Sequence, residues 1–578
     1  MSNSGFSLGS NRHLCLLCLF GLWVVVHAAS EVVVCNILDY GAVGDGVTLN
    51  TESFTAAVQA CCCTANETAP TVYVPSGTFL TGSFVLGSNM ILNVSSSGTI
   101  LGSVNQSDYP LVEPLPSYGI GRDVPTDLRY RSLIFAEKVE KISFVGGGII
   151  DGNGGLWWKK HFLKELEYSR PPLIEIMNSR ELYMSNITLQ NSAFWTFHPY
   201  SSQNIQVTDS NFLAPSYSPN TDGIDIDSCK DVLVERCFFS VGDDGIAIKS
   251  GLNEAGRDYG VPSENILIRD ISVVPDFDNL STNGVSIGSE MSGGVRNVTV
   301  KSSHFKNCES GIYIKSMEGR GGVVENIEFS DISISHTLQA IRLSMNYMYR
   351  RKLSLTQENT ASESKRDASR AIDEEDNDED DLSDIPVFRD ITLRNIQGDQ
   401  CMEAGFFYGL QNSIIQDVHL INVNISSKVG FNCRFVEGHG ANVNPPIHAC
   451  FHHNRGGEDD EEKDDQEVKE EKEDIYELLG DITTAIDYRY DLRDSTGSGM
   501  DCLHVDYLYG DKTPWQNDLY FGLYHTYVDG EYEIRVASSS NLMDWTFRRT
   551  LIKNADMPFI KRLDDDKDGW IILAHEQW

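Results

Sequence analysis

Asn220-Thr221-Asp222-Gly223-Ile224-Asp225-Ile226 is the first of four segments that share the order glycine, apolar, variable, apolar. The later three are Asp243-Asp244-Gly245-Ile246-Ala247-Ile248-Lys249, Asn283-Gly284-Val285-Ser286-Ile287-Gly288 and Ser310-Gly311-Ile312-Tyr313-Ile314-Lys315. Such a repeat is typical of neighbouring parallel strands, whose equivalent positions stack about 4.7–4.9 Å apart. The alignment predicts that Asp222, Asp243 and Asp244 lie together on one wall, with Lys315 further along it.

A second motif, a short strand-like run that starts near an Asn or Asp, recurs at intervals of roughly 23–34 residues outside one acidic interruption. It occurs at Asn204-Ile205-Gln206-Val207, Asn265-Ile266-Leu267-Ile268, Asn297-Val298-Thr299-Val300 and Asn326-Ile327-Glu328-Phe329. Helical solenoids need longer amphipathic runs, so the pattern predicts an all-β protein built on a right-handed parallel β-helix. We expect the four asparagines to form a structural side-chain ladder at equivalent turns rather than to act in catalysis.

The ends of the solenoid are also predicted by pattern. Residues 51–61 carry apolar side chains at helical spacing, namely Phe54, Ala57, Val58 and Cys61, and so predict a helix that caps the N-terminal end. We expect the solenoid to occupy residues 30–452, with a disordered acidic insertion at 350–384. An acidic linker follows at 453–474.

Residues 475–578 have a different character, with alternating strand-like runs rich in aromatic residues that predict a smaller antiparallel β segment. The stretch Ala537-Ser538-Ser539-Ser540-Asn541-Leu542-Met543-Asp544-Trp545 weakly resembles one blade of the five-bladed-propeller glycosidases. One or two blades cannot close a ring, so we expect a partial propeller-like segment without its own catalytic site. An acidic run at 564–569 is interpreted as a hairpin turn rather than as a calcium loop.

The first residues have the layout of a secretory signal. Arg12 precedes an apolar run from Leu14 to Val26, and small residues follow, so residues 1–29 are expected to be cleaved. This run is too short to favour a stable membrane anchor, and no later stretch is apolar enough to span a bilayer. Glycosylation sequons further predict a secreted glycoprotein, at Asn66, Asn93, Asn105, Asn186, Asn279, Asn297 and Asn424.

Composition limits the partners. The chain has 578 residues, of which 41% are hydrophobic, which allows a large core and more than one domain. Much of its net charge of −38 lies in two tracts, Asp373 to Asp384 and Glu458 to Asp474, that we interpret as solvated segments. The overall acidity argues against binding to nucleic acid.

Cys229 and Cys237 flank one coil and are a plausible local disulfide, whereas no cysteine spacing indicates a metal site.

Two acidic motifs carry a family resemblance: Ser218-Pro219-Asn220-Thr221-Asp222-Gly223-Ile224-Asp225 and Gly242-Asp243-Asp244-Gly245. Together with Asp39-Tyr40-Gly41-Ala42-Val43-Gly44-Asp45-Gly46 and Ile149-Ile150-Asp151-Gly152-Asn153-Gly154, they resemble the plant polygalacturonases, which are pectin-cleaving glycoside hydrolases built on a right-handed β-helix. The resemblance extends to about Pro446. It implies that Asp243 is the general acid and that Asp222 and Asp244 activate water, with inversion of configuration.

The chemistry of clustered carboxyls supports an acid among the three. Like charges a few ångströms apart cannot all ionise easily, so one carboxyl tends to keep its proton near neutral pH. Adjacent coils could also hold the carboxyls at the spacing of a retaining enzyme, so inversion follows from the resemblance alone. Turn caps or a calcium cluster are the structural alternatives.

The chain departs from the family pattern at two positions. Asn283 stands where the family has the histidine of Gly-His-Gly, and Tyr313 stands where it has the arginine of Arg-Ile-Lys. Lysine can still pair with a uronate as a point charge, whereas the bidentate arginine partner is lost. The candidate substrate-binding residues are Lys315, Tyr313, Asn283, Arg320, Lys249 and His198. Trp195 is a further candidate, although a core role suits Trp195 and His198 equally well.

The sequence therefore predicts a secreted, monomeric hydrolase of the extracellular space or cell wall. Its substrate would be a pectic polysaccharide, cleaved at α-1,4-galacturonosyl links by acid/base chemistry without a cofactor or metal. One alternative is a pectate lyase on the same scaffold, which would need calcium and a base. Another is a wall protein that binds pectin and has lost catalysis. Chelator sensitivity and unsaturated products would identify the lyase, and binding without cleavage would identify the wall protein.

Overall fold

The computed structural model describes residues 33–62, 69–275, 282–347 and 384–451, together with the backbone of the strands between 501 and 576. The chain divides into two compact units, Met1–Arg455 and Gly456–Trp578. The expected signal at 1–29, the acidic insertion up to residue 383 and the acidic linker at 453–474 lie outside the described residues. No helix in the described part is both long and apolar enough to cross a membrane.

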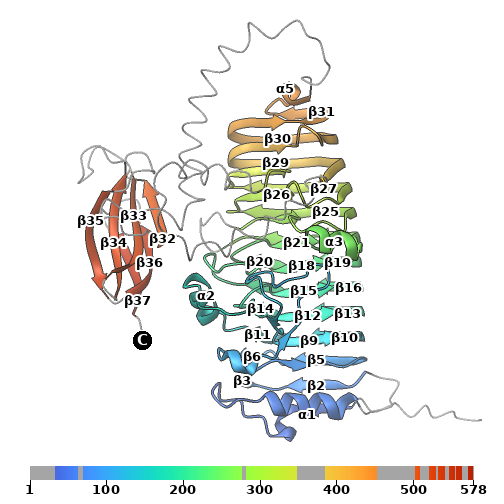
Figure 1. Ribbon diagram of the computed structural model, residues 1–578, viewed down its shortest axis with the longest axis vertical. Helices are drawn as coiled ribbons and strands as arrows, with labels where there is room; N and C mark the ends of the chain where they lie inside the picture. Colours follow the sequence, from blue (N-terminus) through green and yellow to red (C-terminus); the bar gives the residue numbers. More distant parts are fainter. Residues whose placement is uncertain are drawn as a thin grey trace, which may run out of the picture. The chain divides into compact units, whose positions relative to one another are not determined.

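The first unit is a stack of coils that form one 29-stranded sheet (Figure 1). One row of parallel strands carries the aligned glycine segments. Its members are β4 (Phe84–Val85), β9 (Ile134–Glu137), β12 (Ile174–Met177), β15 (Phe197–Tyr200), β18 (Ile224–Asp227), β21 (Ile246–Lys249), β24 (Val285–Ile287), β26 (Ser310–Lys315) and β28 (Gln339–Ser344). The parallel β-helix is thus confirmed.

A second row carries the Asn and Asp motifs. Its members are β1 (Val34–Asn36), β2 (Thr71–Val74), β5 (Met90–Val94), β10 (Glu140–Val145), β13 (Arg180–Ser185), β16 (Gln203–Thr208), β19 (Lys230–Glu235), β22 (Ser263–Arg269), β25 (Val295–Lys306), β27 (Val323–Ser335), β29 (Val387–Tyr408), β30 (Ile415–Arg434) and β31 (Val436–Asn444). The strands β29 and β30 are long enough to turn the corner and complete the first row as well.

A third row closes each coil. Its members are β3 (Gly77–Thr81), β6 (Gly98–Gly102), β11 (Ile149–Asp151), β14 (Thr188–Gln190), β17 (Asn211–Leu213), β20 (Phe238–Ser240) and β23 (Ser272–Val273). Outside the three rows lie the antiparallel pair β7 (Leu111–Val112) and β8 (Arg129–Tyr130), the 3-10 helices η1 (Ile37–Tyr40) and η2 (Gln106–Asp108), and the helices α2 (Gly155–Phe162), α3 (Asn253–Tyr259) and α5 (His448–Phe451).

Close approach between coils explains the repeated glycine. A Cβ atom at Gly223 would lie 2.5 Å from the carbonyl oxygen of Gly245, and one at Gly245 would lie 2.7 Å from that of Gly284. Gly284 and Gly311 are in the same situation, with a carbonyl oxygen of the next coil at 2.2 Å and 3.0 Å respectively. No side chain fits there, so the sequence must place glycine immediately before each of these strands.

The apolar residues that follow each glycine form the core. In the register of the first row, Ile224, Ile246, Val285 and Ile312 stack on one another, and all are 0–1% exposed. Burying each of these side chains contributes about 1.5–3 kcal/mol relative to leaving it exposed. Because the period of a strand is two, the residues between them face outward, which is where the functional side chains lie.

The predicted asparagine ladder is present on the second row at three of its four positions, Asn265, Asn297 and Asn326. Asn265 Nδ2 donates to Asp231 Oδ1 at 2.8 Å, and Asn297 Nδ2 donates to Asn265 Oδ1 at 2.7 Å. Asn326 continues the ladder at 3.5 Å, and all of these residues have a φ between 54° and 59°. Asn and Asp tolerate this left-handed conformation better than other residues, which explains why they recur at the turns.

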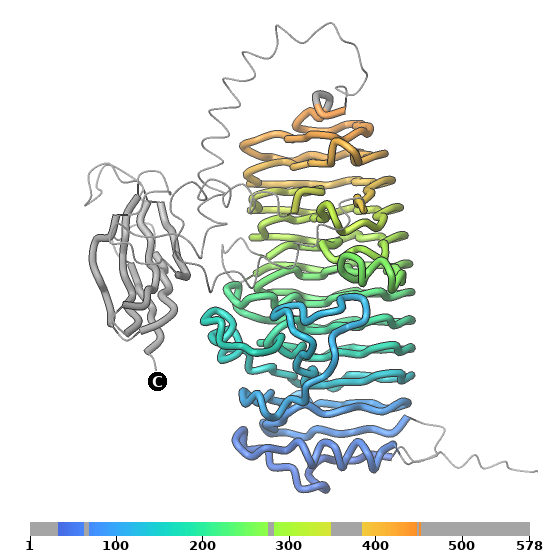
Figure 2. Tube along the Cα trace, viewed as in Figure 1, coloured from blue at the N-terminus to red at the C-terminus, as the bar shows by residue number. Residues whose placement is uncertain are grey.

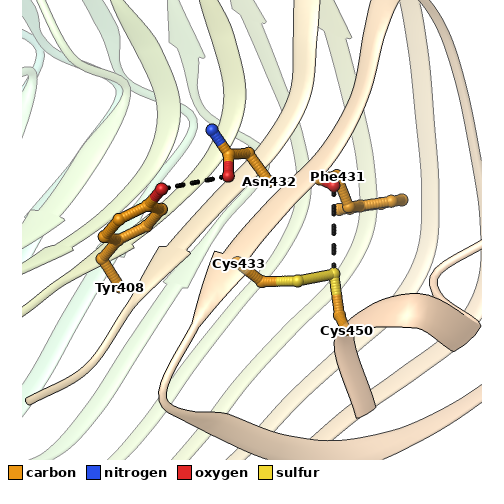
Figure 3. The surroundings of a disulfide bond; sticks show 5 residues. All are labelled: Tyr408, Phe431, Asn432, Cys433 and Cys450. Atoms are coloured by element: carbon orange, nitrogen blue, oxygen red, sulfur yellow. Dashed lines mark hydrogen bonds between the residues drawn. A yellow bond between two sulfur atoms is a disulfide. The ribbon is translucent and has the colours of Figure 1, made fainter. Parts of the chain in front are cut away.

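The N-terminal end is capped as predicted. Helix α1 (Thr51–Cys62) buries Phe54, Ala57, Val58 and Cys61, and a disulfide joins Cys61 to Cys35. At the other end of the coils a second disulfide links Cys433 of β30 to Cys450 of α5 (Figure 3).

The predicted disulfide between Cys229 and Cys237 is wrong. Both are buried thiols, and they flank the two ends of β19. Six extended residues at about 3.3 Å per residue hold the two cysteines roughly 20 Å apart, whereas a disulfide needs Cα atoms within about 7 Å. Instead, each thiol lies within hydrogen-bonding distance of backbone carbonyl oxygens, such as that of Pro199 at 3.2 Å from Cys229 Sγ.

The second unit is antiparallel, as the sequence predicts. A four-stranded sheet contains β32 (Asp501–Tyr507), β33 (Tyr520–Val528), β34 (Glu531–Ser539) and β35 (Thr546–Lys553), in that order. A separate pair is formed by β36 (Ala555–Arg562) and β37 (Trp570–Glu576). Its interpretation as a partial propeller stays a prediction.

Candidate active site

Two of the three aspartates occupy the same position on adjacent coils. Asp222 and Asp244 each precede a repeat glycine, and Gly223 N donates to the backbone oxygen of Asp244 at 2.9 Å. The next coil places Asn283 at the same level, since Gly245 N donates to its backbone oxygen at 2.8 Å. The register of the first row therefore brings these side chains together, while Asp243 comes one position earlier.

The three carboxylates form a tight cluster at the edge of a pocket. One oxygen of each of Asp222, Asp243 and Asp244 lies within 4.8 Å of the others. Asp222 and Asp244 are 3% and 1% exposed, whereas Asp243 is only partly buried. The cluster opens into a polar pocket of about 180 Å³. Of the three, Asp243 is therefore the best placed to reach a bound molecule.

Asp244 is fixed by two partners from later coils. Lys315 Nζ lies 2.9 Å from its Oδ2, and Asn283 Nδ2 donates to its Oδ1 at 2.8 Å. Asn283 is held in turn by Ser310 N, which donates to its Oδ1 at 3.1 Å. The substitution of asparagine at position 283 thus supplies a neutral donor to the buried carboxylate.

Asp222 shares a second buried cation. Lys249 Nζ lies 3.7 Å from Asp222 Oδ2, 3.4 Å from Asp225 Oδ1 and 3.4 Å from Glu290 Oε2, and it sits 4.7 Å from the centre of the Trp195 ring. Burial lowers the pKa of Lys249, but the surrounding carboxylates raise it by more, so this lysine stays charged.

Within the trio, the electrostatics favour Asp243 as the acid. Burial raises its pKa well above the usual range, and the neighbouring charges of Asp222 and Asp244 raise it further. Burial also raises the pKa of Asp222, but Lys249 opposes the shift. No direct ion pair is made by Asp243 among the described residues. The proton in the cluster is therefore best held by Asp243.

A buried arginine supports Asp243 from behind. Arg170 donates from Nη2 to Asn220 Oδ1 at 2.8 Å and pairs with Asp123 at 2.6 Å. Asn220 Nδ2 lies 3.5 Å from Asp243 Oδ2. Because Arg170 is 1% exposed and also binds two backbone carbonyls, it fixes the loop that carries Asn220 and orients the amide toward the acid.

The predicted binding residues separate into groups. Lys315 and Lys249 line the pocket. Asn283 contacts Asp244 rather than the pocket. Tyr313 is 3% exposed, and the Arg342 guanidinium covers its ring at 4.6 Å.

Arg320 and His198 lie away from the cavity. Arg320 is 7% exposed, and its Nη1 donates to Asn253 Oδ1. His198 has the core role that the sequence left open beside substrate binding, because its side chain is fully buried between Glu175 at 3.1 Å and Asp227 at 3.3 Å. Burial lowers the pKa of His198, but hydrogen bonds to both carboxylates raise it by more. His198 therefore belongs to a buried charge network.

Several pocket residues were not predicted. Glu290, Arg122, Asp123 and Tyr347 all line the cavity. Arg122 Nη2 pairs with Glu290 Oε1 at 2.6 Å, across 168 residues of sequence. Neither residue belongs to the repeat pattern. The one available signal was the position of Glu290, three residues after β24 ends at Ile287.

Three carboxylates at this distance could in principle share a metal ion. Two of them already have a lysine partner, however, at Asp244–Lys315 and Asp222–Lys249. A pair of ammonium groups supplies the countercharge that a divalent cation would otherwise provide. The donor set therefore suits acid/base chemistry better than a dedicated calcium cage.

Comparison with known proteins gives one family. The model of glycosyl hydrolases family 28 matches residues 65–363. A probable polygalacturonase of Vitis vinifera is 36% identical over 416 residues, covering 71% of this chain and 79% of the relative. An exo-poly-alpha-D-galacturonosidase of Dickeya chrysanthemi is 26% identical, covering 54% and 57%. The solved exopolygalacturonase of Thermotoga maritima superposes with a TM-score of 0.57 at 28% identity, covering 71% of this chain and 91% of that protein. The chain belongs to glycosyl hydrolases family 28 and is a glycosidase that hydrolyses O-glycosyl bonds.

Proposed function

We propose that the protein hydrolyses α-1,4-galacturonosyl links in polygalacturonate, the backbone of pectin. The observation that carries this proposal is the aspartate trio at the edge of a pocket that also contains two lysines, Lys249 and Lys315. A carboxylate cluster supplies acid and base, and ammonium groups attract an anionic sugar polymer. The names of the relatives in Vitis, Dickeya and Thermotoga support the same substrate.

In this mechanism Asp243 protonates the glycosidic oxygen. Its raised pKa keeps a proton available near neutral pH, and its partial exposure lets it reach the bond. General acid catalysis of this kind contributes about 10²–10⁴-fold to the rate. Asp222 and Asp244, at the same level on adjacent coils, would hold and deprotonate the attacking water.

Inversion of configuration is the second part of the proposal. Asp222 and Asp244 each lie beside a buried lysine that fixes the carboxyl in the wall, which suits positioning of a water better than attack on the sugar. The oxygens of the trio lie within 4.8 Å, which is closer than the roughly 6.5–9.5 Å typical of inverting carboxyl pairs, so spacing does not provide the argument. Proton NMR of the first product decides it: an inverting enzyme releases the β anomer from an α link.

We further propose that the protein is secreted to the cell wall. The N-terminal sequence pattern predicts export, and two disulfides, Cys35–Cys61 and Cys433–Cys450, suit an oxidising compartment. Expression of the full chain with a C-terminal tag, followed by detection in medium and wall fractions, tests this. Retention of the tagged chain inside the cell would contradict it.

The activity test is the release of reducing ends from polygalacturonate by the full chain. Wild type should release them, and Asp243→Asn should lose about 10²–10⁴-fold in kcat. Asn395→Gly, a change in the exposed ladder, is the matched control and should keep wild-type kcat. No release by wild type would refute the proposal. Unsaturated products and loss of activity with a chelator would instead identify a calcium-dependent lyase.

A further inference from the structure

The outer face of the coils on the N-terminal side of the pocket is covered by residues 113–128, here called the covering segment. It connects β7 to β8, and Figure 2 shows it in blue where it crosses the coils. Tyr118 Oη donates to Asp227 Oδ2 at 2.7 Å, and Tyr200 Oη donates to Ser117 Oγ at 3.0 Å. The outward-facing positions of β15 and β18 therefore contact protein rather than a groove.

The covering segment is packed, and it is not a loose flap. A hydrophobic cluster separate from the solenoid core joins it to the outer face, and each member is at most 9% exposed. This cluster consists of Leu115, Tyr118, Met177, Phe194, Trp195, Tyr200 and Leu252. A buried ion pair between Arg129 and Glu175 at 2.9 Å lies beside it. A long polymer cannot pass along this side of the pocket while that cluster is in place.

The same segment also forms part of the wall of the pocket. Arg122 pairs with Glu290 at 2.6 Å, and Asp123 pairs with Arg170 at 2.6 Å. Arg122, Asp123 and Glu290 line the cavity together with the aspartate trio. The covering segment therefore bounds the site on its N-terminal side.

The opposite side has a different surface. The register places Arg342 of β28, Phe406 of β29 and Asn432 of β30 in one outward row. Tyr408 and Arg434 form the neighbouring row. Arg434 is exposed and the others are partly exposed, in contrast to the buried outward positions under the covering segment. These five residues are here called the open strip.

The open strip has the chemistry of a binding surface for an acidic sugar chain. The rings of Phe406 and Tyr408 stack at 4.1 Å, and the Arg342 guanidinium lies 5.8 Å from the Phe406 ring. Tyr408 Oη donates to Asn432 Oδ1 at 3.1 Å, which fixes both side chains (Figure 3). Aromatic faces pack against sugar rings, and arginine pairs with carboxylates.

The open strip is continuous with the active site. It begins one coil beyond Lys315 and lies on the same row of strands. From β21 to β30 there are five coil steps, or about 24 Å at roughly 4.8 Å per step, which is long enough for several sugar units. Lys315, Arg342 and Arg434 follow one another along this length. Lys315 pairs with Asp244 at 2.9 Å and Arg342 pairs with Glu309 at 3.1 Å, so the exposed Arg434 is the cation of the strip best placed to meet a uronate.

We propose that the enzyme acts on one end of its polymer: the terminal unit enters the closed pocket, and the rest of the chain runs over the open strip. This inference rests on the proposed function. It assigns an exo mode of cleavage and adds a binding surface formed by Arg342, Phe406, Tyr408, Asn432 and Arg434. The bond broken is the glycosidic C–O bond nearest that end, with water as the second reactant.

The mode is tested with polygalacturonate and the full chain by measuring viscosity, reducing ends and early products together. We expect mono- or digalacturonate as the early product, with a slow fall in viscosity relative to the reducing ends released. Early oligomers of mixed length with a rapid fall in viscosity would overturn the inference while leaving the proposed function intact. No release of reducing ends at all would refute the proposed function, and the inference with it.

The open strip is tested separately with Arg342→Ala and Arg434→Gln. The KM for the polymer should rise about tenfold, as expected for loss of one charge-assisted contact, and it should rise much less for trigalacturonate. Arg389→Ala, on the same strand as Phe406 but in the second row, is the matched control and should change neither value. Arg434 is exposed, so its substitution preserves folding and keeps the test valid if Arg342→Ala does not fold. Equal rises for polymer and trimer would overturn the assignment of the strip.

Discussion

Substitution of Asn283 tests how the site orients Asp244, one of the two carboxyls proposed to activate water. Its side chain is 4% exposed and bridges two coils, donating to Asp244 Oδ1 at 2.8 Å and accepting from Ser310 N at 3.1 Å. Replacement by alanine removes both hydrogen bonds without adding a charge. Asp244 would keep its ion pair with Lys315 and would lose the contact that fixes its orientation.

The magnitude follows from these two contacts. A hydrogen bond to a charged group contributes about 1.5–3 kcal/mol, which corresponds to a loss of about 10- to 150-fold if it acts fully in the transition state. The amide of Ser310 would be left buried without its partner, which costs about 1–3 kcal/mol of folding free energy. We therefore expect Asn283→Ala to lower both kcat and stability.

The assay is steady-state kinetics on polygalacturonate together with denaturant unfolding. The matched control is Asn395→Gly, because Asn395 also donates to one coil, at Asp331, and accepts from the next, at Asn422, but lies on the exposed ladder. The control should lose some stability and no kcat. If Asn283→Ala and the control had the same kcat, orientation of Asp244 by Asn283 would play no part in catalysis.

Two further predictions concern buried charges. Lys249→Met should lower the free energy of unfolding in urea by about 3–5 kcal/mol, because it leaves Glu290 and two aspartates without their shared cation. The control is Lys230→Met, which removes the exposed pair with Glu264 and should have almost no effect on that free energy. Equal losses in the two variants would contradict the argument. His198→Asn should reduce stability more below pH 6.5 than in alkaline solution. The pKa of His198 is raised in the fold, so its protonation stabilises the fold fully below the ordinary value of 6.5, and this contribution disappears as the pH rises through the raised pKa. A stability difference that does not change with pH would show that His198 is uncharged in the fold.

Much of the fold could be predicted because each coil of a solenoid needs the same residue types at the same positions, so the sequence pattern repeats once per coil. The glycine that precedes each strand is required by a carbonyl oxygen at 2.2–3.0 Å in the neighbouring coil, so it repeats in register with Asp222, Asp244 and Asn283. The same register brought the aspartate trio together in the prediction. Helix α1 was predictable for a similar reason, since its four buried side chains repeat at helical spacing.

The residues that were missed or misplaced lie outside that repeat. Arg122 reaches the pocket from the covering segment, which has no periodic pattern, so its contact with Glu290 could not be inferred from spacing. His198 has the right position for an outward side chain, but the covering segment buries it. Cys229 and Cys237 are close in sequence and separated by a straight strand. In each case the outcome depended on packing between distant segments.

The central claim, that Asp243 donates the proton to the leaving oxygen, is tested most directly by changing the leaving group. Asp243→Asn should lose about 10²–10⁴-fold in kcat on trigalacturonate, yet should cleave an aryl galacturonide with a strongly acidic phenol leaving group at close to the wild-type rate, because such a leaving group departs without protonation. A loss of the same size on both substrates would contradict the role of Asp243 as the general acid.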